Sequence, residues 1–203
     1  MGQYVYSIAI AFGICLAWLL FLTFFFPTYE IYQFFAQTPV ESEQAIADHQ
    51  QITYYLLGMQ PQLNASLYTQ RELIHMQDVR FLFWLAISLV LFIGAVLWFS
   101  RQYHSHKVYQ KVGILLVGVP FALLFFSIAF FQTVFTWFHK LLFTNDYWLL
   151  PTNAHLLGLY PESFFFSFAI LWMTSCVATG LLLTGVTTEN LKSVVLKKSS
   201  KKT

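Results

Sequence analysis

Four long apolar runs limit what this 203-residue chain can fold into. Each run is long enough to cross about 30 Å of hydrocarbon as an α-helix. Only 10% of the residues are charged, whereas soluble domains average about 25%. The sequence therefore predicts an all-α membrane protein in which one membrane domain holds four transmembrane helices. The predicted spans are residues 5–26, 81–100, 112–138 and 163–188.

Two polar segments, residues 30–80 and 139–162, separate these spans. We expect them to form a small extracellular helical cap. In the first segment, Thr38-Pro39-Val40-Glu41 has the pattern of a helix start, and Gly58 and Pro61 predict where that helix ends. The apolar face expected for this helix consists of Val40, Ala47, Ile52, Tyr55, Leu56 and Met59.

The basic residues predict the orientation of the chain in the membrane. Cytoplasmic segments carry an excess of Lys and Arg. That rule is met if both termini are cytoplasmic and residues 189–203 form a basic cytoplasmic tail. The inner residues are then Arg101, Lys107, Lys111, Lys192, Lys197, Lys198, Lys201 and Lys202, and the outer ones are Arg71, Arg80 and Lys140. The net charge of +2 is too small to indicate a nucleic-acid partner.

A dense group of ionisable residues precedes the second span. Thr69 and Glu72 have the spacing of a capping box, which predicts a helix start near Gln70. In such a helix Arg71, His75 and Asp78 share one face, because they are separated by four and three residues. A carboxylate beside an imidazole can fix its tautomer and stabilise its charged form. The alternative is a solvated helix end at the membrane interface.

A second histidine, His139, lies where the third span ends, and we expect it at the same depth as His75. Two such imidazoles suit paired general acid and base roles. The alternative is that both are interfacial residues without a partner. His155, on a predicted loop, is a third candidate. Asn145 and Trp148 can donate hydrogen bonds to a developing oxyanion, although Trp148 also fits an interface anchor.

The sequence gives little support for a nucleophilic serine or cysteine, or for a metal site. The chain has no GxSxG motif, and Cys15 and Cys176 lie inside apolar runs, where they read as packing residues. We therefore expect no covalent intermediate on serine or cysteine. His104 and His106 could contact a metal, but no further ligands lie near them in sequence, so we expect no metal site.

Aromatic residues are concentrated towards the outer ends of the spans, and more of them occur there than an interfacial belt requires. A lipid-like substrate between bundle and cap would use such walls. The outer set is Phe24, Phe25, Phe26, Tyr32, Phe34, Phe35, Tyr54, Tyr55, Phe81, Trp84, Phe135, Trp137, Phe138, Phe143, Tyr147, Phe164, Phe165 and Phe166, and the inner set is Trp98, Tyr103 and Tyr109.

Three sequence elements at the outer ends of the spans match a known pattern. They are Glu72-Leu73-Ile74-His75-Met76-Gln77-Asp78-Val79-Arg80, then Phe138-His139 with Trp148, and then Leu159-Tyr160-Pro161-Glu162-Ser163-Phe164-Phe165. Together they resemble the lipoprotein intramolecular transacylases of Gram-positive bacteria. The resemblance covers nearly the whole chain, because the order of spans and outer segments also agrees.

The resemblance implies acyl transfer within a diacylated lipoprotein, from the glyceryl sn-2 oxygen to the amine of the N-terminal cysteine. It further implies two histidines where the cap meets membrane lipid, and neither metal nor cofactor. In this chain His75, oriented by Asp78, would remove a proton from the amine. His139 would protonate the glyceryl oxygen or polarise the ester, and the two roles could be exchanged. Arg71, Glu72, Asn145, Trp148 and His155 would support them.

Two other functions remain compatible with the residues alone. The aromatic face could bind another helix in a non-enzymatic membrane assembly protein. Two facing histidines could also hold a cofactor such as haem in a bundle. The sequence does not indicate an oligomeric state.

Overall fold

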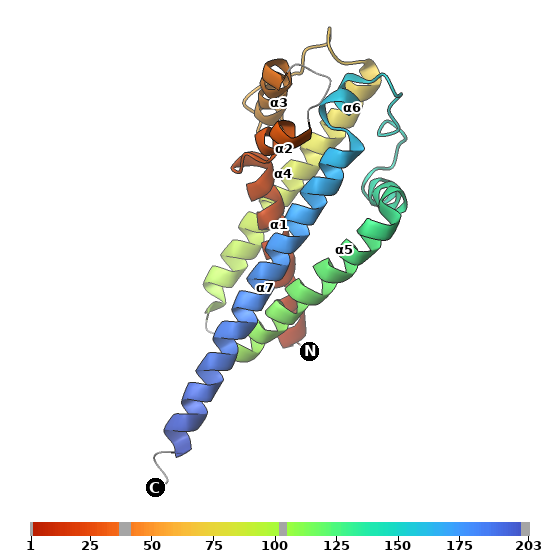
Figure 1. The fold of residues 1–203 in the computed structure, drawn as a ribbon. Helices are drawn as coiled ribbons and strands as arrows, with labels where there is room; N and C mark the ends of the chain where they lie inside the picture. Colours follow the sequence, from red (N-terminus) through yellow and green to blue (C-terminus); the bar gives the residue numbers. More distant parts are fainter. Residues whose placement is uncertain (1, 37–41, 102–104, 200–203) are drawn as a thin grey trace. The chain divides into compact units, whose positions relative to one another are not determined.

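The computed structural model of the chain describes residues 2–36, 42–101 and 105–199, without the side chains of residues 2, 36, 42 and 186–199. Within these ranges the regular structure is entirely helical, which confirms the all-α class (Figure 1). The helices are α1 (Gly2–Phe24), α2 (Thr28–Ala36), α3 (Ser42–Leu56), α4 (Gln70–Phe99), α5 (His106–Leu142), α6 (His155–Leu159) and α7 (Glu162–Ser199).

Four of the described helices are long and apolar enough to cross a membrane. They are the segments Gln3–Phe24, Gln70–Phe99, His106–Leu142 and Glu162–Gly185, which confirms the four transmembrane helices. The helices α4, α5 and α7 extend beyond the predicted apolar runs, because the polar turns next to these runs also adopt helical structure.

The chain divides into two compact units. Unit 1 consists of Met1–Trp18, Leu89–Phe125 and Trp172–Thr203, and unit 2 consists of Leu19–Ser88 and Phe126–Leu171. The four long helices each contribute to both units. The single membrane domain expected from the sequence stays a prediction.

Unit 1 is held together by small and aliphatic side chains. Its buried core consists of Ile10, Ala11, Val108, Val112, Leu116 and Cys176. A Cβ atom added to Gly113 would lie 2.8 Å from the carbonyl oxygen of Gly180, so α5 and α7 approach each other backbone to backbone. The indole of Trp18 donates a hydrogen bond of 2.9 Å to Thr179 Oγ1. Cys15 and Cys176 are free thiols, in keeping with a packing role.

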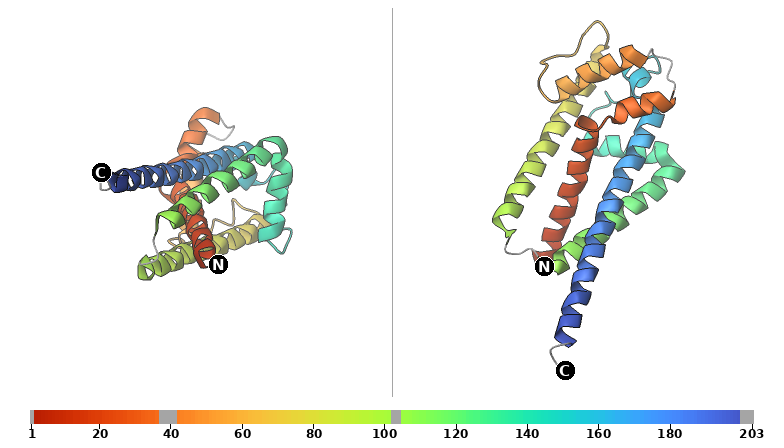
Figure 2. Two further views of the ribbon diagram at one scale, coloured as in Figure 1. Left: turned by 90° about the horizontal axis from the view of Figure 1, so that it is seen from below. Right: turned by 60° about the vertical axis from the view of Figure 1, so that its left-hand side comes forward.

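Unit 2 contains the cap, in which α3 contacts both α2 and α6 (Figure 2). Its core is richer in aromatic residues than that of unit 1. The buried members are Tyr29, Ala45, Ile52, Tyr55, Leu56, Leu63, Tyr68, Met76, Leu156, Leu159 and Phe164. The cap expected from the two polar segments is therefore a packed helical structure.

The structure corrects the predicted apolar face of α3. Ala47 and Met59 are exposed, whereas Ala45 and Asp48 are buried together with Ile52, Tyr55 and Leu56. The buried stripe includes a carboxylate, and its register is therefore shifted from the one that apolar residues alone predict. The proposed helix start at residues 38–41 lies outside the described residues.

Three further features of the helices were not predicted. The short helices α2 and α6 are absent from the predicted elements, because each is too short to show a clear apolar period. Helix α5 runs through Pro120 without a break, and its non-helical residue is Phe130, with φ −139° and ψ 41°. This break lies in unit 2, between Pro120 and the histidine near the end of α5.

Candidate active site

The first turn of α4 is fixed by the predicted capping box. Glu72 Oε2 accepts hydrogen bonds of 2.8 Å from both the backbone N–H and the hydroxyl of Thr69. In return the backbone N–H of Glu72 donates to Thr69 Oγ1 at 3.4 Å. The helix therefore begins at Gln70, as its sequence predicts.

Glu72 also joins α4 to the second polar segment. Its side chain is fully buried, and Oε1 accepts a hydrogen bond of 2.8 Å from the backbone N–H of Leu156 in α6. A buried carboxylate is tolerated where its oxygens are hydrogen-bonded, and both Glu72 oxygens are. This residue therefore supports the structure of the cap rather than facing solvent.

The structure brings His75 and His139 together. Their ring centroids are 6.2 Å apart, and the ring planes are tilted by 37°. Phe143 lies against both rings, with centroids 5.1 Å from His75 and 5.6 Å from His139. The Nδ1 atom of His75 is buried without a hydrogen-bond partner among the described residues. A small group placed beside the two rings would contact both imidazoles.

His139 is held in one orientation by its own helix and by aromatic rings. Its Nδ1 lies 2.8 Å from the carbonyl oxygen of Phe135, one turn earlier in α5. Because a carbonyl only accepts, Nδ1 carries the hydrogen and Nε2 holds the lone pair of the neutral ring. Trp148 stacks on the ring with centroids 4.9 Å apart. The ring is thereby prepared to accept a proton at Nε2.

Asp78 does not have the hydrogen bond that the sequence led us to expect. Its Oδ2 accepts a hydrogen bond of 2.9 Å from Nδ2 of Asn145, while Nδ1 of His75 has no partner in the part of the chain that the structure describes. Asn145 Oδ1 accepts in turn from the backbone N–H of Tyr147 at 3.0 Å. Asp78 therefore fastens the loop after α5 to α4. Its predicted role in orienting His75 stays a prediction.

Arg71 reinforces the same connection. Its Nη2 donates a hydrogen bond to the carbonyl oxygen of Asp146, and its guanidinium lies 5.6 Å from the ring centroid of Tyr147. Both residues belong to the loop that carries Trp148. The loop is thus attached to α4 at two points, and its tryptophan is held against His139.

His155 pairs with a residue that the sequence analysis did not single out. Its Nε2 donates a hydrogen bond of 2.9 Å to Oδ2 of Asp48, whose side chain is buried in α3. The ring of Tyr68 lies edge-on to His155 at 5.3 Å. The Tyr68 hydroxyl is buried without a partner among the described residues, and burial raises the pKa of Tyr68. His155 thus belongs to the cap network at the start of α6.

A second histidine in the cap, His49, was also missed. Its ring stacks on Tyr29 at 4.2 Å, and its Nδ1 shares a hydrogen bond of 2.8 Å with the Tyr160 hydroxyl. Tyr29 donates to the carbonyl oxygen of Leu159 and accepts from Gln33. Burial lowers the pKa of His49 and raises the pKa of Tyr29 to about 12. Helical spacing from Ile52 back to Asp48 and Ala45 was the signal that could have located this stripe.

The described side chains were compared with the requirements of a metal site. Among the described His, Cys, Asp and Glu side chains, no group of three is positioned to hold a metal ion. His106 is exposed, and His104, its neighbour in the weak HxH pattern, lies outside the described residues.

Four apolar helices, with two facing imidazoles in the unit that contains the cap, define a multi-pass integral membrane protein. The family model for the lipoprotein intramolecular transacylase Lit matches residues 2–165. The chain belongs to the lipoprotein intramolecular transacylase family. It is therefore a membrane acyltransferase that acts on lipoproteins, and the resemblance noted in the sequence is confirmed.

Solved structures of the lipoprotein intramolecular transacylase Lit from Bacillus cereus share this fold. One is 22% identical with a TM-score of 0.69, and the alignment covers 98% of this chain and 96% of that one. A histidine-to-arginine variant is 21% identical with a TM-score of 0.69, covering 96% and 92%. A histidine-to-alanine variant is 21% identical with a TM-score of 0.66, and the alignment covers 96% of this chain and 94% of that one. At these identities the likeness concerns the fold alone. No curated protein matches the chain.

Proposed function

We propose that this enzyme moves the sn-2 acyl chain of a diacylglyceryl lipoprotein to the amine of its N-terminal cysteine. Membership of the transacylase family supports transfer within a lipoprotein. The observation that carries the proposal is the pair of imidazoles, 6.2 Å apart and lined by aromatic rings. Intramolecular transfer requires positioning, a base and an acid, and it requires no nucleophile from the enzyme.

The proposed step balances without a co-reactant. The amine nitrogen attacks the ester carbonyl, so a C–N bond forms and the C–O bond to the glyceryl carbon breaks. The amine loses one proton, and the departing glyceryl oxygen gains one. The products are an amide on the cysteine and a free glyceryl hydroxyl. One imidazole accepts the first proton and the other supplies the second, so a proton passed between them restores the site.

The structure favours His139 as the base. Its Nδ1–H donates a hydrogen bond to the Phe135 carbonyl oxygen, so the lone pair of the neutral ring is on Nε2. His75 would then supply the proton to the glyceryl oxygen. In the sequence analysis, the role of base is first given to His75 and that of acid to His139. The hydrogen bond from His139 to Phe135 supports the opposite assignment.

Asp78, Asn145 and Trp148 act on this pair through the loop after α5. Asp78 holds Asn145, and Trp148 stacks on His139, so the three residues position the base. The second amide hydrogen of Asn145 and the indole N–H of Trp148 are the donors proposed for the oxyanion that develops on the ester.

We also propose that both termini are cytoplasmic and that the site lies at the extracellular membrane interface. The excess of basic residues in the inner segments supports this orientation. In a cell labelled with an impermeant thiol reagent, Gln50→Cys should react from outside and Lys107→Cys only after permeabilisation. External labelling at position 107 would place the histidines on the wrong side.

The reaction is tested with a synthetic diacylglyceryl lipopeptide in liposomes. Transfer within one molecule leaves the total mass unchanged, so the product must be recognised by tandem mass spectrometry or by its alkali-resistant amide-linked chain. Liposomes of deuterated phospholipid decide where the chain comes from. An unlabelled N-acyl chain is expected, and a deuterated one would show transfer from membrane lipid.

The choice of the second histidine needs its own comparison. If His139 is the base, His139→Ala should abolish most of the product while His155→Ala retains it. The reverse result would assign the reaction to the Asp48–His155 pair. Full activity in both variants would disprove paired-histidine catalysis in this chain. The absorption spectrum of the purified protein separates this mechanism from a bis-histidine haem site.

A further inference from the structure

Helix α2 exposes an apolar face that its neighbour α3 lacks. Phe34 and Phe35 are 80% and 77% exposed, and Ile31 is also exposed. Successive helical residues turn by about 100°, which places these three side chains on one stripe. The exposed residues of α3 with described side chains are Glu43, Gln44, Ala47, Gln50 and Tyr54, of which only Tyr54 is a large hydrophobic residue. Two packed helices of the same unit therefore present different surfaces to their surroundings.

The opposite face of α2 is part of the cap core. Tyr29 and Gln33 are 1% and 6% exposed, and they are linked by a hydrogen bond of 2.7 Å. Tyr32, on the flank, shares a hydrogen bond with Ser163 at the start of α7. These contacts fix the rotation of α2 about its axis, so Phe34 and Phe35 cannot turn inward without breaking the core.

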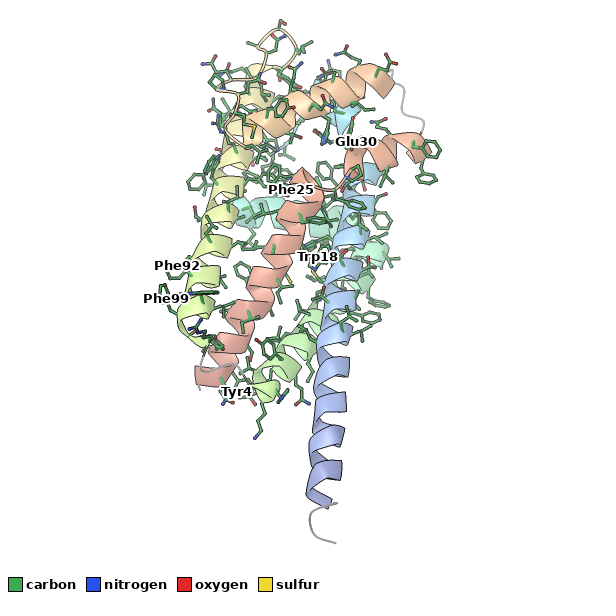
Figure 3. The ribbon with its side chains drawn as sticks, turned by 90° about the vertical axis from the view of Figure 1, so that its left-hand side faces the viewer. Tyr4, Trp18, Phe25, Glu30, Phe92 and Phe99 are labelled. Carbon is green, nitrogen blue, oxygen red and sulfur yellow. The ribbon has the colours of Figure 1, made fainter. Side chains whose placement is uncertain are left out.

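The connection to α1 places α2 close to the membrane boundary. The 23 residues of α1 give a length of about 34 Å, similar to the roughly 30 Å of the hydrocarbon layer. Only Phe25, Phe26 and Pro27 separate α1 from α2, and three residues reach at most about 10 Å. The headgroup layer is about 5–8 Å thick on each side. Figure 3 shows Phe25 where α1 ends and Glu30 on α2.

We propose that α2 lies in the membrane surface as an interfacial helix, with Ile31, Phe34 and Phe35 inserted among phospholipid acyl chains. An amphipathic helix with a large apolar face binds bilayers in this way. Phe25, which is 77% exposed at the end of α1, extends the same apolar surface. The cap is then anchored to lipid by α2 in addition to its connections to the spans. This inference is independent of the proposed reaction.

The size of the patch favours lipid over a second copy of the chain. The three side chains of α2 together with Phe25 expose on the order of 550 Å². A stable protein interface buries about 800 Å² on each partner, so this face is smaller than a dimer requires. A bilayer has no such minimum, because each apolar side chain inserts by itself.

A photo-cross-linking experiment identifies what touches this face. Benzoylphenylalanine replaces Phe34, Phe35, Gln50 or Leu91 in the full chain, in vesicles of phosphatidylglycerol and phosphatidylethanolamine. Leu91 is an exposed residue of the membrane-spanning helix α4 and is the positive control, and Gln50 on α3 is the water-facing control. After irradiation, intact mass spectrometry detects phospholipid adducts, and denaturing gels detect cross-linked dimers.

The expected result is phospholipid adducts at positions 34 and 35 in yields similar to position 91 and several-fold above position 50. Yields no higher than at position 50 would overturn the proposal. Cross-linked dimers at positions 34 and 35 would also overturn it, because a second copy would then cover the face. Elution of each variant at the volume of the unmodified protein confirms that the variants are folded.

Discussion

The two units of this protein bury different kinds of residue. The described core of unit 1 consists of aliphatic and small side chains, with helices in contact at Gly113 and Gly180. Unit 2 buries Asp48 and Glu72 and contains four histidines, at positions 49, 75, 139 and 155. An ionisable group is costly to bury unless it is paired. The comparison indicates that packing constrains unit 1, whereas hydrogen-bonded networks and chemistry constrain unit 2.

The largest effect is expected at the histidine pair of unit 2. His75→Ala and His139→Ala should each lower the transfer rate by about 10²–10⁴-fold, the range for a general acid or base. The double variant should be little worse, because groups that act as one unit are not additive. The rate is measured per folded protein with the lipopeptide assay. Additive losses would contradict a shared proton transfer.

The next largest effect is on stability, at Glu72. Glu72→Ala leaves the N–H groups of Thr69 and Leu156 without their acceptor and should cost roughly 2–5 kcal/mol. A lower thermal unfolding midpoint in detergent micelles checks this. Glu43→Ala, at an exposed position in the first turn of α3, is the matched control and should change stability by no more than about 0.5 kcal/mol.

In unit 1 the corresponding test is a single methyl group. Gly113→Ala places a Cβ 2.8 Å from a backbone oxygen of α7, which cannot move aside like a flexible side chain, and should destabilise by about 1–3 kcal/mol. Gly118→Ala in the same helix meets nothing within 4 Å and should be neutral or slightly stabilising. Equal unfolding midpoints for the two variants would refute a close backbone contact.

A smaller loss is expected from one hydrogen bond of unit 1. Trp18→Phe removes the indole donor to Thr179 and should cost about 1 kcal/mol. Trp98→Phe, at an exposed position, is the control and should leave the unfolding midpoint unchanged. Neither variant should alter the transfer rate of the folded protein, and a large rate defect in Trp18→Phe would show that the two units are not functionally separate.

The smallest effect expected is a pH dependence that belongs to unit 2. Burial holds the pKa of His49 below its ordinary value of 6.5, so below that pH the unfolded chain binds more protons than the folded one. The contribution of neutral His49 to the free energy of unfolding is therefore fully present above about pH 6.5. It is lost as the pH falls towards the lowered pKa. His49→Gln should reduce the loss of unfolding midpoint between about pH 7 and pH 5. His106→Gln, at an exposed residue of unit 1, should not.

The sequence predicts best what depends on local spacing or on the thickness of the bilayer. The four spans follow from uncharged runs of sufficient length, and the start of α4 follows from Thr69 and Glu72. The proximity of His75 and His139 could be predicted from topology. His75 lies near the start of one span and His139 near the end of the next, and these two ends lie on the same side of the membrane. Each of these inferences needs only a few neighbouring residues or a count of spans.

Long-range polar contacts could not be predicted in this way. Asp48 and His155 are 107 residues apart, and nothing near either residue identifies the other. Asp78 could reach His75 within its own helix, yet its carboxylate accepts a hydrogen bond from Asn145, a donor supplied by the loop after α5. Helices α2 and α6 depend on packing within the cap and have too few residues to show a period.

The hydrogen bond between Glu72 and Leu156 also has a consequence for biogenesis. The two residues are 84 positions apart, so at about 5–20 residues per second the ribosome adds Leu156 between roughly 4 and 17 s after Glu72. During this interval Oε2 of Glu72 can bond its neighbour Thr69, whereas the donor for Oε1, the backbone N–H of Leu156, has not yet been synthesised. Synthesis of the cap therefore begins early in translation, and its closure must wait until Leu156, about three quarters of the way along the chain, has been added.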